Sequence, residues 1–214
     1  MLDARVRRML APGLESVGAK LSDAGVPPLA LTVGGWMAGV MACVAAATGS
    51  WSTALGLWIL NRVLDGLDGP VARRRGQTEL GGFLDLVADF SIYAGFVVGV
   101  AIARPEAQVA CLVLLTTYYL SGTAFLAVSS LVKEGSRRWD DGRSLRFVGG
   151  LAEGTETVIV YVLFCLLPDH VTTIAWGFSV LVAITAVQRV AMGVHLLRRP
   201  DDIALENSHR LQER

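Results

Sequence analysis

Two short runs of the sequence each present a pair of aspartates at helical spacing. Asp65 and Asp68 are three residues apart, and Asp85 and Asp89 are four apart. On a helix these intervals turn the side chains by about 60° and about 40°, so each pair shares one helix face. The polar segment 73–79 between the runs leaves room only for a turn. We therefore expect two antiparallel helices whose carboxylates face each other.

Apolar sequence surrounds these aspartates, which makes their grouping costly. One Asp at the centre of a membrane helix costs roughly 2.5–3.5 kcal/mol, and neighbouring carboxylates repel one another. Cations offset this cost, and carboxylate oxygens suit Mg²⁺ or Mn²⁺, which are often bound together with substrate phosphates. One alternative is that the aspartates are helix caps or halves of structural ion pairs. Another is a divalent-cation transporter, because carboxylates in membranes also line ion pathways.

The composition indicates a membrane protein with several spans. The chain has 214 residues, of which 53% are hydrophobic and 23 are glycine, and its formal net charge is zero. This is too apolar for an ordinary soluble domain, and glycine is frequent where helices pack closely in lipid. The balanced charge gives no indication of nucleic-acid binding. Membrane lipids are therefore the expected surroundings.

The elements that must position the aspartates are apolar helices. We expect an all-α integral membrane bundle of six transmembrane helices, preceded by an N-terminal amphipathic interfacial helix. Segments of about 20 apolar residues suffice to cross about 30 Å of hydrocarbon. The expected spans are residues 29–48, 52–75, 79–103, 107–132, 147–167 and 172–197. The predicted division is a juxtamembrane segment, a six-span domain and a charged cytoplasmic tail, at residues 1–26, 27–197 and 198–214.

Lysine and arginine are concentrated in alternate loops. The N-terminal segment, the 73–79 turn, the 133–146 loop and the tail are rich in them, whereas the other three loops hold one arginine between them. Basic loops stay on the cytoplasmic side. Both termini and the aspartates are therefore expected at the cytoplasmic face, which is that of the inner membrane if the source is bacterial.

The residues around the aspartates resemble the signature of the CDP-alcohol phosphotransferases, also called CDP-alcohol phosphatidyltransferases. That signature is Asp-x2-Asp-Gly-x2-Ala-Arg … Gly-x3-Asp-x3-Asp. The matching positions are Asp65, Asp68, Gly69, Ala72, Arg73, Gly81, Asp85 and Asp89. The spacer 74–80 is one residue shorter than is usual in the family. Members are integral membrane enzymes that transfer a phosphatidyl or phosphoalcohol group from a CDP donor to an alcohol.

The resemblance implies roles for these residues. One divalent ion, Mg²⁺ or Mn²⁺, would be held by Asp65, Asp68 and Asp85, and a second by Asp65, Asp85 and Asp89. Asp89 would also be the base for the acceptor hydroxyl. The residues expected to contact the CDP donor are Leu29, Thr32, Gly69, Ala72, Arg73, Thr78 and Gly81. Leu29 stands where the family has an asparagine.

The leading hypothesis is a phospholipid-synthesising enzyme that transfers the phosphatidyl group of CDP-diacylglycerol to a small hydroxylated acceptor and releases CMP. The alternative within the class uses a soluble CDP-alcohol donor and a lipid acceptor. Glu153, Glu156 and Arg189 lie at similar depth in the last two spans. They are expected to form either an acceptor pocket or a structural ion pair. The identity of the acceptor and the formation of a homodimer both stay open.

Overall fold

The described part of the chain consists of helices. The computed structural model describes residues 2–131 and 154–212, and within them it contains seven α-helices and two short 3-10 helices. In chain order these are α1 (Leu2–Asp23), α2 (Pro28–Ala47), α3 (Trp51–Arg75), α4 (Glu79–Ala103), η1 (Pro105–Ala107), α5 (Gln108–Leu131), α6 (Gly154–Leu166), η2 (Pro168–His170) and α7 (Val171–Gln212). The expected all-α class is confirmed.

Four segments are long and apolar enough to cross a membrane. They are Pro28–Ala47, Glu79–Ala103, Pro105–Ser130 and Pro168–His195. The shorter apolar helix α6 has 13 described residues, and the 25-residue helix α3 carries several charged groups. The first four expected spans agree with α2 to α5 within a residue at each end. Helix α7 continues without a break through the expected border at residues 197 and 198.

A tight turn joins α3 to α4 and places the aspartates of the two helices next to each other. Gly76 follows the last residue of α3 with a φ of 102°, a left-handed conformation that favours glycine. Thr78 then caps α4, since its hydroxyl oxygen accepts a hydrogen bond from the Gly81 N–H at 3.0 Å. Only residues 76–78 separate the two helices. The predicted antiparallel hairpin is therefore present.

Helix α2 packs closely against both helices of this hairpin because glycines line its contacts. A Cβ on Gly35 would lie 3.3 Å from Leu64 Cβ of α3, and one on Gly39 would lie 2.7 Å from the side chain of Ile92 of α4. Gly99 of α4 faces α2 in return. Small residues allow helix backbones to approach in this way in lipid.

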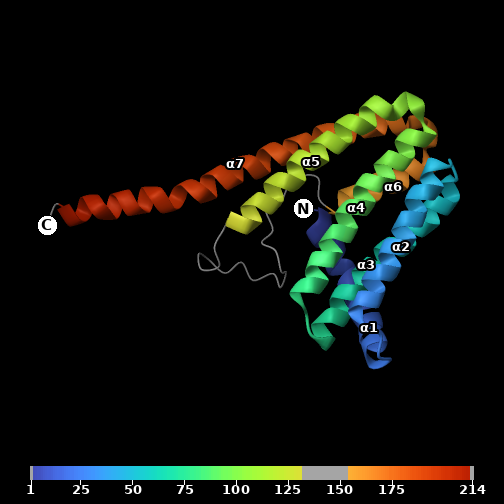
Figure 1. Cartoon of the computed structure of the whole chain (residues 1–214), viewed down its shortest axis with the longest axis horizontal. Coiled ribbons are helices and arrows are strands. Elements are labelled where there is room, and N and C mark those ends of the chain that lie inside the picture. The colour runs from blue at the N-terminus through green and yellow to red at the C-terminus, as the bar shows by residue number, and fades with distance from the viewer. Residues whose placement is uncertain (1, 132–153, 213–214) are drawn as a thin grey trace.

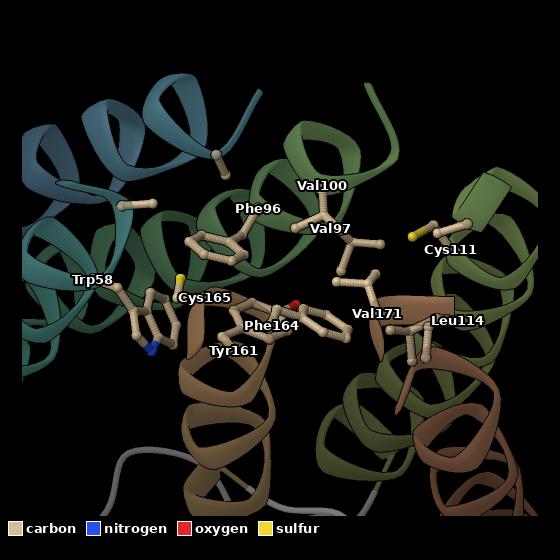
Figure 2. Packing of buried hydrophobic residues seen from close by; sticks show 14 of the residues in the cluster. Trp58, Phe96, Val97, Val100, Cys111, Leu114, Tyr161, Phe164, Cys165 and Val171 are labelled. Carbon is tan, nitrogen blue, oxygen red and sulfur yellow. The ribbon is translucent and has the colours of Figure 1, made fainter. Parts of the chain in front are cut away.

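An aromatic core lies on the other side of the hairpin and joins α3, α4 and α6 (Figure 2). The rings of Phe96 and Tyr161 stack at a centroid distance of 4.8 Å, and Trp58 lies 5.0 Å from Tyr161. Phe164 continues the stack at 5.8 Å from Tyr161. All four side chains are fully buried. This core fixes the orientation of α3, because its buried residue Trp58 lies about two helical turns before Asp65.

The remaining helices extend the bundle at two sides (Figure 1). Helices α5 and α7 run side by side, and α7 projects beyond the other helices (Figure 1). Helix α1 packs on α3, where Leu14 joins a small cluster with Leu67 and Val71. On its outer side Met9 and Leu10 are exposed. Helix α1 thus covers the end of α3 that carries the aspartates.

Candidate functional site

Three carboxylates from two helices meet at one point. Asp65 and Asp68 of α3 and Asp85 of α4 each offer an oxygen atom, and these atoms all lie within 4.8 Å of one another. Asp68 precedes Gly76 by eight residues and Asp85 follows Thr78 by seven. At 1.5 Å per helical residue both therefore lie roughly 10–12 Å from the turn. The predicted meeting of the two aspartate pairs is confirmed for these three side chains.

Helix α2 also contributes to the cluster. The Thr32 hydroxyl donates a hydrogen bond of 2.8 Å to Oδ2 of Asp68, which is buried. A cavity of about 10 Å³ lies next to these groups and is lined by Thr32, Asp65, Asp85 and Asp89 among others. A space of this size accommodates about one water-sized particle. Hard oxygen ligands around so small a space fit one divalent cation such as Mg²⁺ or Mn²⁺.

Asp89 lies one helical turn beyond Asp85 and has a different partner. Its Oδ1 accepts a hydrogen bond of 2.8 Å from Nη2 of Arg62. It lines the same cavity but does not belong to the three-carboxylate group. The structure thus divides the four aspartates into a cluster of three and a fourth that is paired with an arginine.

Arg62 is the site residue that the sequence analysis missed. Its Nη1 also donates to the hydroxyl of Tyr93 at 2.8 Å and lies 3.4 Å from Oδ2 of Asp65. Its Nε donates to Oδ1 of Asn61 at 2.7 Å. A charged residue in an apolar helix is expensive whichever sign it carries. The rule that singled out the aspartates would therefore have singled out Arg62, three residues before Asp65.

The residues expected to contact the donor lie on α2, α3 and the start of α4, and several have local partners. Arg73 is exposed and forms an ion pair with Glu15 of α1. Thr78 caps α4 by binding the Gly81 N–H. Leu29 is 46% exposed at the start of α2. Gly69 and Ala72 are half-buried on the last turns of α3.

The expected acceptor residues are only partly described. Glu153 lies outside the described residues. Glu156 is half-buried in the first turn of α6. Arg189 of α7 contacts α5, because its Nη1 donates to the Ser121 hydroxyl at 2.8 Å and its Cζ lies 5.4 Å from the ring centroid of Phe125. The acceptor pocket and the structural ion pair both stay predictions.

Comparisons with known proteins agree with this geometry. The family model described as CDP-alcohol phosphatidyltransferase matches residues 26–188. The chain is 38% identical over 203 residues to the inner membrane protein YnjF of Escherichia coli (strain K12). The aligned region covers 92% of this chain and 98% of YnjF. Together with the helices described above, these matches define an all-α enzyme with several candidate membrane spans and clustered carboxylates. The chain belongs to the CDP-alcohol phosphatidyltransferase family.

Solved structures share the fold. The phosphatidylinositol phosphate synthase of Mycobacterium tuberculosis with CDP-DAG bound superimposes with a TM-score of 0.68 at 21% identity, covering 84% of this chain and 92% of that chain. The same enzyme in complex with manganese and citrate gives a TM-score of 0.69 at 20% identity, covering 84% and 88%. At this level of identity the likeness establishes the fold alone.

Proposed function

We propose that this enzyme transfers the phosphatidyl group of CDP-diacylglycerol to a small hydroxylated acceptor and releases CMP. The observation that carries the proposal is the meeting of Asp65, Asp68 and Asp85 in a family whose members use CDP donors. The Mycobacterium tuberculosis relative of similar fold has been crystallised with CDP-DAG bound. The apolar exposed faces of α2 and α4 would leave the acyl chains of such a donor in lipid.

We propose that Asp65, Asp68 and Asp85 hold one divalent ion. When bound, the ion would neutralise charge on the donor diphosphate, as metals do in phosphoryl transfer. A second ion at Asp65, Asp85 and Asp89 also remains a prediction from the family resemblance. Arg62 contacts two of these three carboxylates, those of Asp65 and Asp89. A second ion would therefore compete with Arg62 for them.

Other residues are assigned contacts with the donor and the acceptor. Gly69 lacks a Cβ, so a nucleotide can approach the α3 backbone closely. Arg73 can offer two N–H groups to a phosphate, after exchange of its exposed contact with Glu15. Leu29, Ala72, Thr78 and Gly81 would complete the donor contacts. The acceptor would be held near Glu153, Glu156 and Arg189.

Asp89 is proposed as the base for the acceptor hydroxyl. The acceptor oxygen would form a bond to the phosphorus that carries diacylglycerol, and the bond from that phosphorus to the oxygen of CMP would break. The hydroxyl proton would pass to Asp89, whose carboxylate lines the cavity beside Asp85. Arg62 orients this carboxylate through its hydrogen bond.

We further propose six spans with both termini and the active site on the cytoplasmic side. Helices α3 and α6 would be the two additional spans, residues 1–26 an interfacial segment, 27–197 the membrane domain and 198–214 a charged tail. Arg104 supports this arrangement, since it pairs with Asp169 at 2.8 Å and lies over the ring of Trp51. The start of α3, the end of α4 and the α6–α7 turn therefore share one end of the bundle, opposite the 73–79 turn.

The test is CMP release by purified protein in lipid nanodiscs containing Mn²⁺. CDP-diacylglycerol is supplied with glycerol phosphate, inositol, inositol phosphate, serine or phosphatidylglycerol in separate reactions. We expect CMP with at least one acceptor and none in EDTA. Release of CMP only from a soluble CDP-alcohol in the presence of diacylglycerol would replace the proposed donor. Metal uptake into proteoliposomes without any CDP compound would favour a transporter.

A further inference from the structure

The guanidinium of Arg62 lies between the carboxylates and the aromatic core. Its side chain is only 13% exposed. Its Cζ lies 4.8 Å from the ring centroid of Trp58 and 5.1 Å from that of Tyr93. Aromatic faces at such distances attract a cation. The positive charge of Arg62 is therefore held between the aspartates and the aromatic core.

Hydrogen bonds hold the Arg62 guanidinium in one position and orientation. All three of its nitrogens donate: Nε to Asn61, Nη1 to Tyr93 and Asp65, and Nη2 to Asp89. Asn61 is anchored in turn, because its Nδ2 donates to the Gly35 carbonyl oxygen at 2.8 Å. A planar fork with this many partners has one favourable position. Moving it would leave buried polar groups without partners, at about 1–3 kcal/mol each.

Arg62 joins Asp65 to Asp89, two of the three carboxylates assigned to a second ion. An ion bound to the Asp65 and Asp89 carboxylates would therefore lie close to Nη1 and Nη2 of Arg62. These nitrogens already lie 3.4 Å from Asp65 Oδ2 and 2.8 Å from Asp89 Oδ1. An added divalent ion would compete for the same oxygens and repel the guanidinium. At the first ion position Arg62 contacts one of the three carboxylates, that of Asp65, whereas at the second it contacts two.

We propose that Arg62 is the second cation of this site. The chain then binds a single divalent ion at Asp65, Asp68 and Asp85, and the guanidinium takes the place of a second ion while it positions Asp89. This inference rests on the proposed metal site. Arg62 is a positioning residue in this account, and its charge balances part of the negative charge of the four aspartates.

The experiment counts Mn²⁺ ions on the full-length protein in nanodiscs without nucleotide. Calorimetry gives the stoichiometry, and electron paramagnetic resonance distinguishes an isolated Mn²⁺ from a spin-coupled pair. We expect one isolated Mn²⁺ per chain in the unmodified protein. The variant Arg62→Met should bind a second Mn²⁺ and give the coupled spectrum. The matched control Arg104→Met removes an arginine from the opposite end of the bundle and should still bind one.

A second variant keeps the test decisive even if Arg62→Met does not fold. Asp89→Asn removes a ligand of the second ion only, so it should still bind one Mn²⁺ with unchanged affinity. A coupled pair in the unmodified protein, loss of an equivalent in Asp89→Asn, or a single Mn²⁺ in folded Arg62→Met would overturn the inference while leaving the proposed transferase intact. Absence of any Mn²⁺ binding would reject the metal site itself and the inference with it.

Discussion

Asp68 is the residue in which the requirement for a cation is greatest. It is buried, it lies within 4.8 Å of two other carboxylates, and Thr32 donates a hydrogen bond to it. Burial of a carboxylate in an apolar bundle is costly unless a cation or donors compensate it. A metal ion shared with Asp65 and Asp85 would provide that compensation.

Replacing Asp68 should therefore weaken metal-dependent binding of the nucleotide. In Asp68→Ala we expect CDP affinity in Mg²⁺ to fall by at least about tenfold, because even partners of metal ligands are worth this much. Calorimetry in Mg²⁺ and in EDTA measures the difference. The control is Asp169→Ala, which removes an exposed carboxylate at the opposite end of the bundle. Equal CDP affinity in Asp68→Ala and the unmodified protein would remove Asp68 from the ligands.

Asp89 should affect turnover rather than binding. In Asp89→Asn we expect kcat for CMP release to fall by about 10²–10⁴-fold, which is the usual contribution of a general base. CDP affinity should stay the same, because the three-carboxylate group does not include this residue. Single-turnover CMP release, measured beside the CDP binding isotherm, separates the two effects. Near-normal CMP release would refute the assignment of the base.

At the scale of residues, the grouping of the aspartates could be predicted from the sequence, whereas the contacts of Arg62 could not. The aspartates follow helical spacing within each run, so their shared face could be predicted from 65, 68, 85 and 89 alone. Arg62 meets Asp89 across 27 residues of sequence, and no spacing rule gives a contact between two helices. The division of the four aspartates into three plus one depends on that contact and could not be predicted.

At the scale of elements, the hairpin was predictable and the packing against it was not. Helix α3 ends in three arginines followed by Gly76, and Thr78 is a common N-cap type. The glycines of α2 and α4 indicate close packing, but their partners depend on the three-dimensional register. Gly99 illustrates this, because a Cβ there would lie 2.5 Å from the carbonyl oxygen of Cys43.

Gly99 should be intolerant of a single methyl group. We expect Gly99→Ala to destabilise the protein by about 1–3 kcal/mol, because α4 must move away from the α2 backbone. Gly56→Ala is the matched control, since nothing lies within 4 Å of its Cβ. That change should be neutral or stabilise by roughly 0.5–1 kcal/mol, as alanine suits a helix interior better. Thermal unfolding in one detergent compares them, and equal shifts in Tm would contradict the packing account.

For the whole molecule, the sequence predicted the number and order of the helices well. Four spans satisfy length and hydropathy, whereas α3 falls short because the site itself places charges in it. The expected site residues therefore lower the hydropathy of the helix that carries them. The acceptor pocket could not be derived from the sequence, since it depends on how α6 and α7 meet α5, as the contact of Arg189 with Ser121 shows.

The proposed orientation predicts which loops are reached from each side of the membrane. Gln77 lies in the α3–α4 turn and Glu106 in the turn at the opposite end, where its side chain is 61% exposed. In inside-out vesicles a membrane-impermeant maleimide should label Gln77→Cys and not Glu106→Cys, and in right-side-out vesicles the reverse. The unsubstituted chain is the control, because Cys111 and Cys165 are buried and Cys43 is half-buried. Labelling of both positions from one side would contradict the six-span arrangement.

The central claim is that Asp65, Asp68 and Asp85 hold an ion that contacts the donor's diphosphate. The most direct measurement is the ³¹P relaxation of CDP in the presence of Mn²⁺ bound to the protein, because the paramagnetic effect falls steeply with distance from the ion. We predict strong acceleration for both phosphorus nuclei, and its loss in Asp68→Ala. Tightly bound Mn²⁺ and bound CDP with unaccelerated phosphorus relaxation would contradict the account.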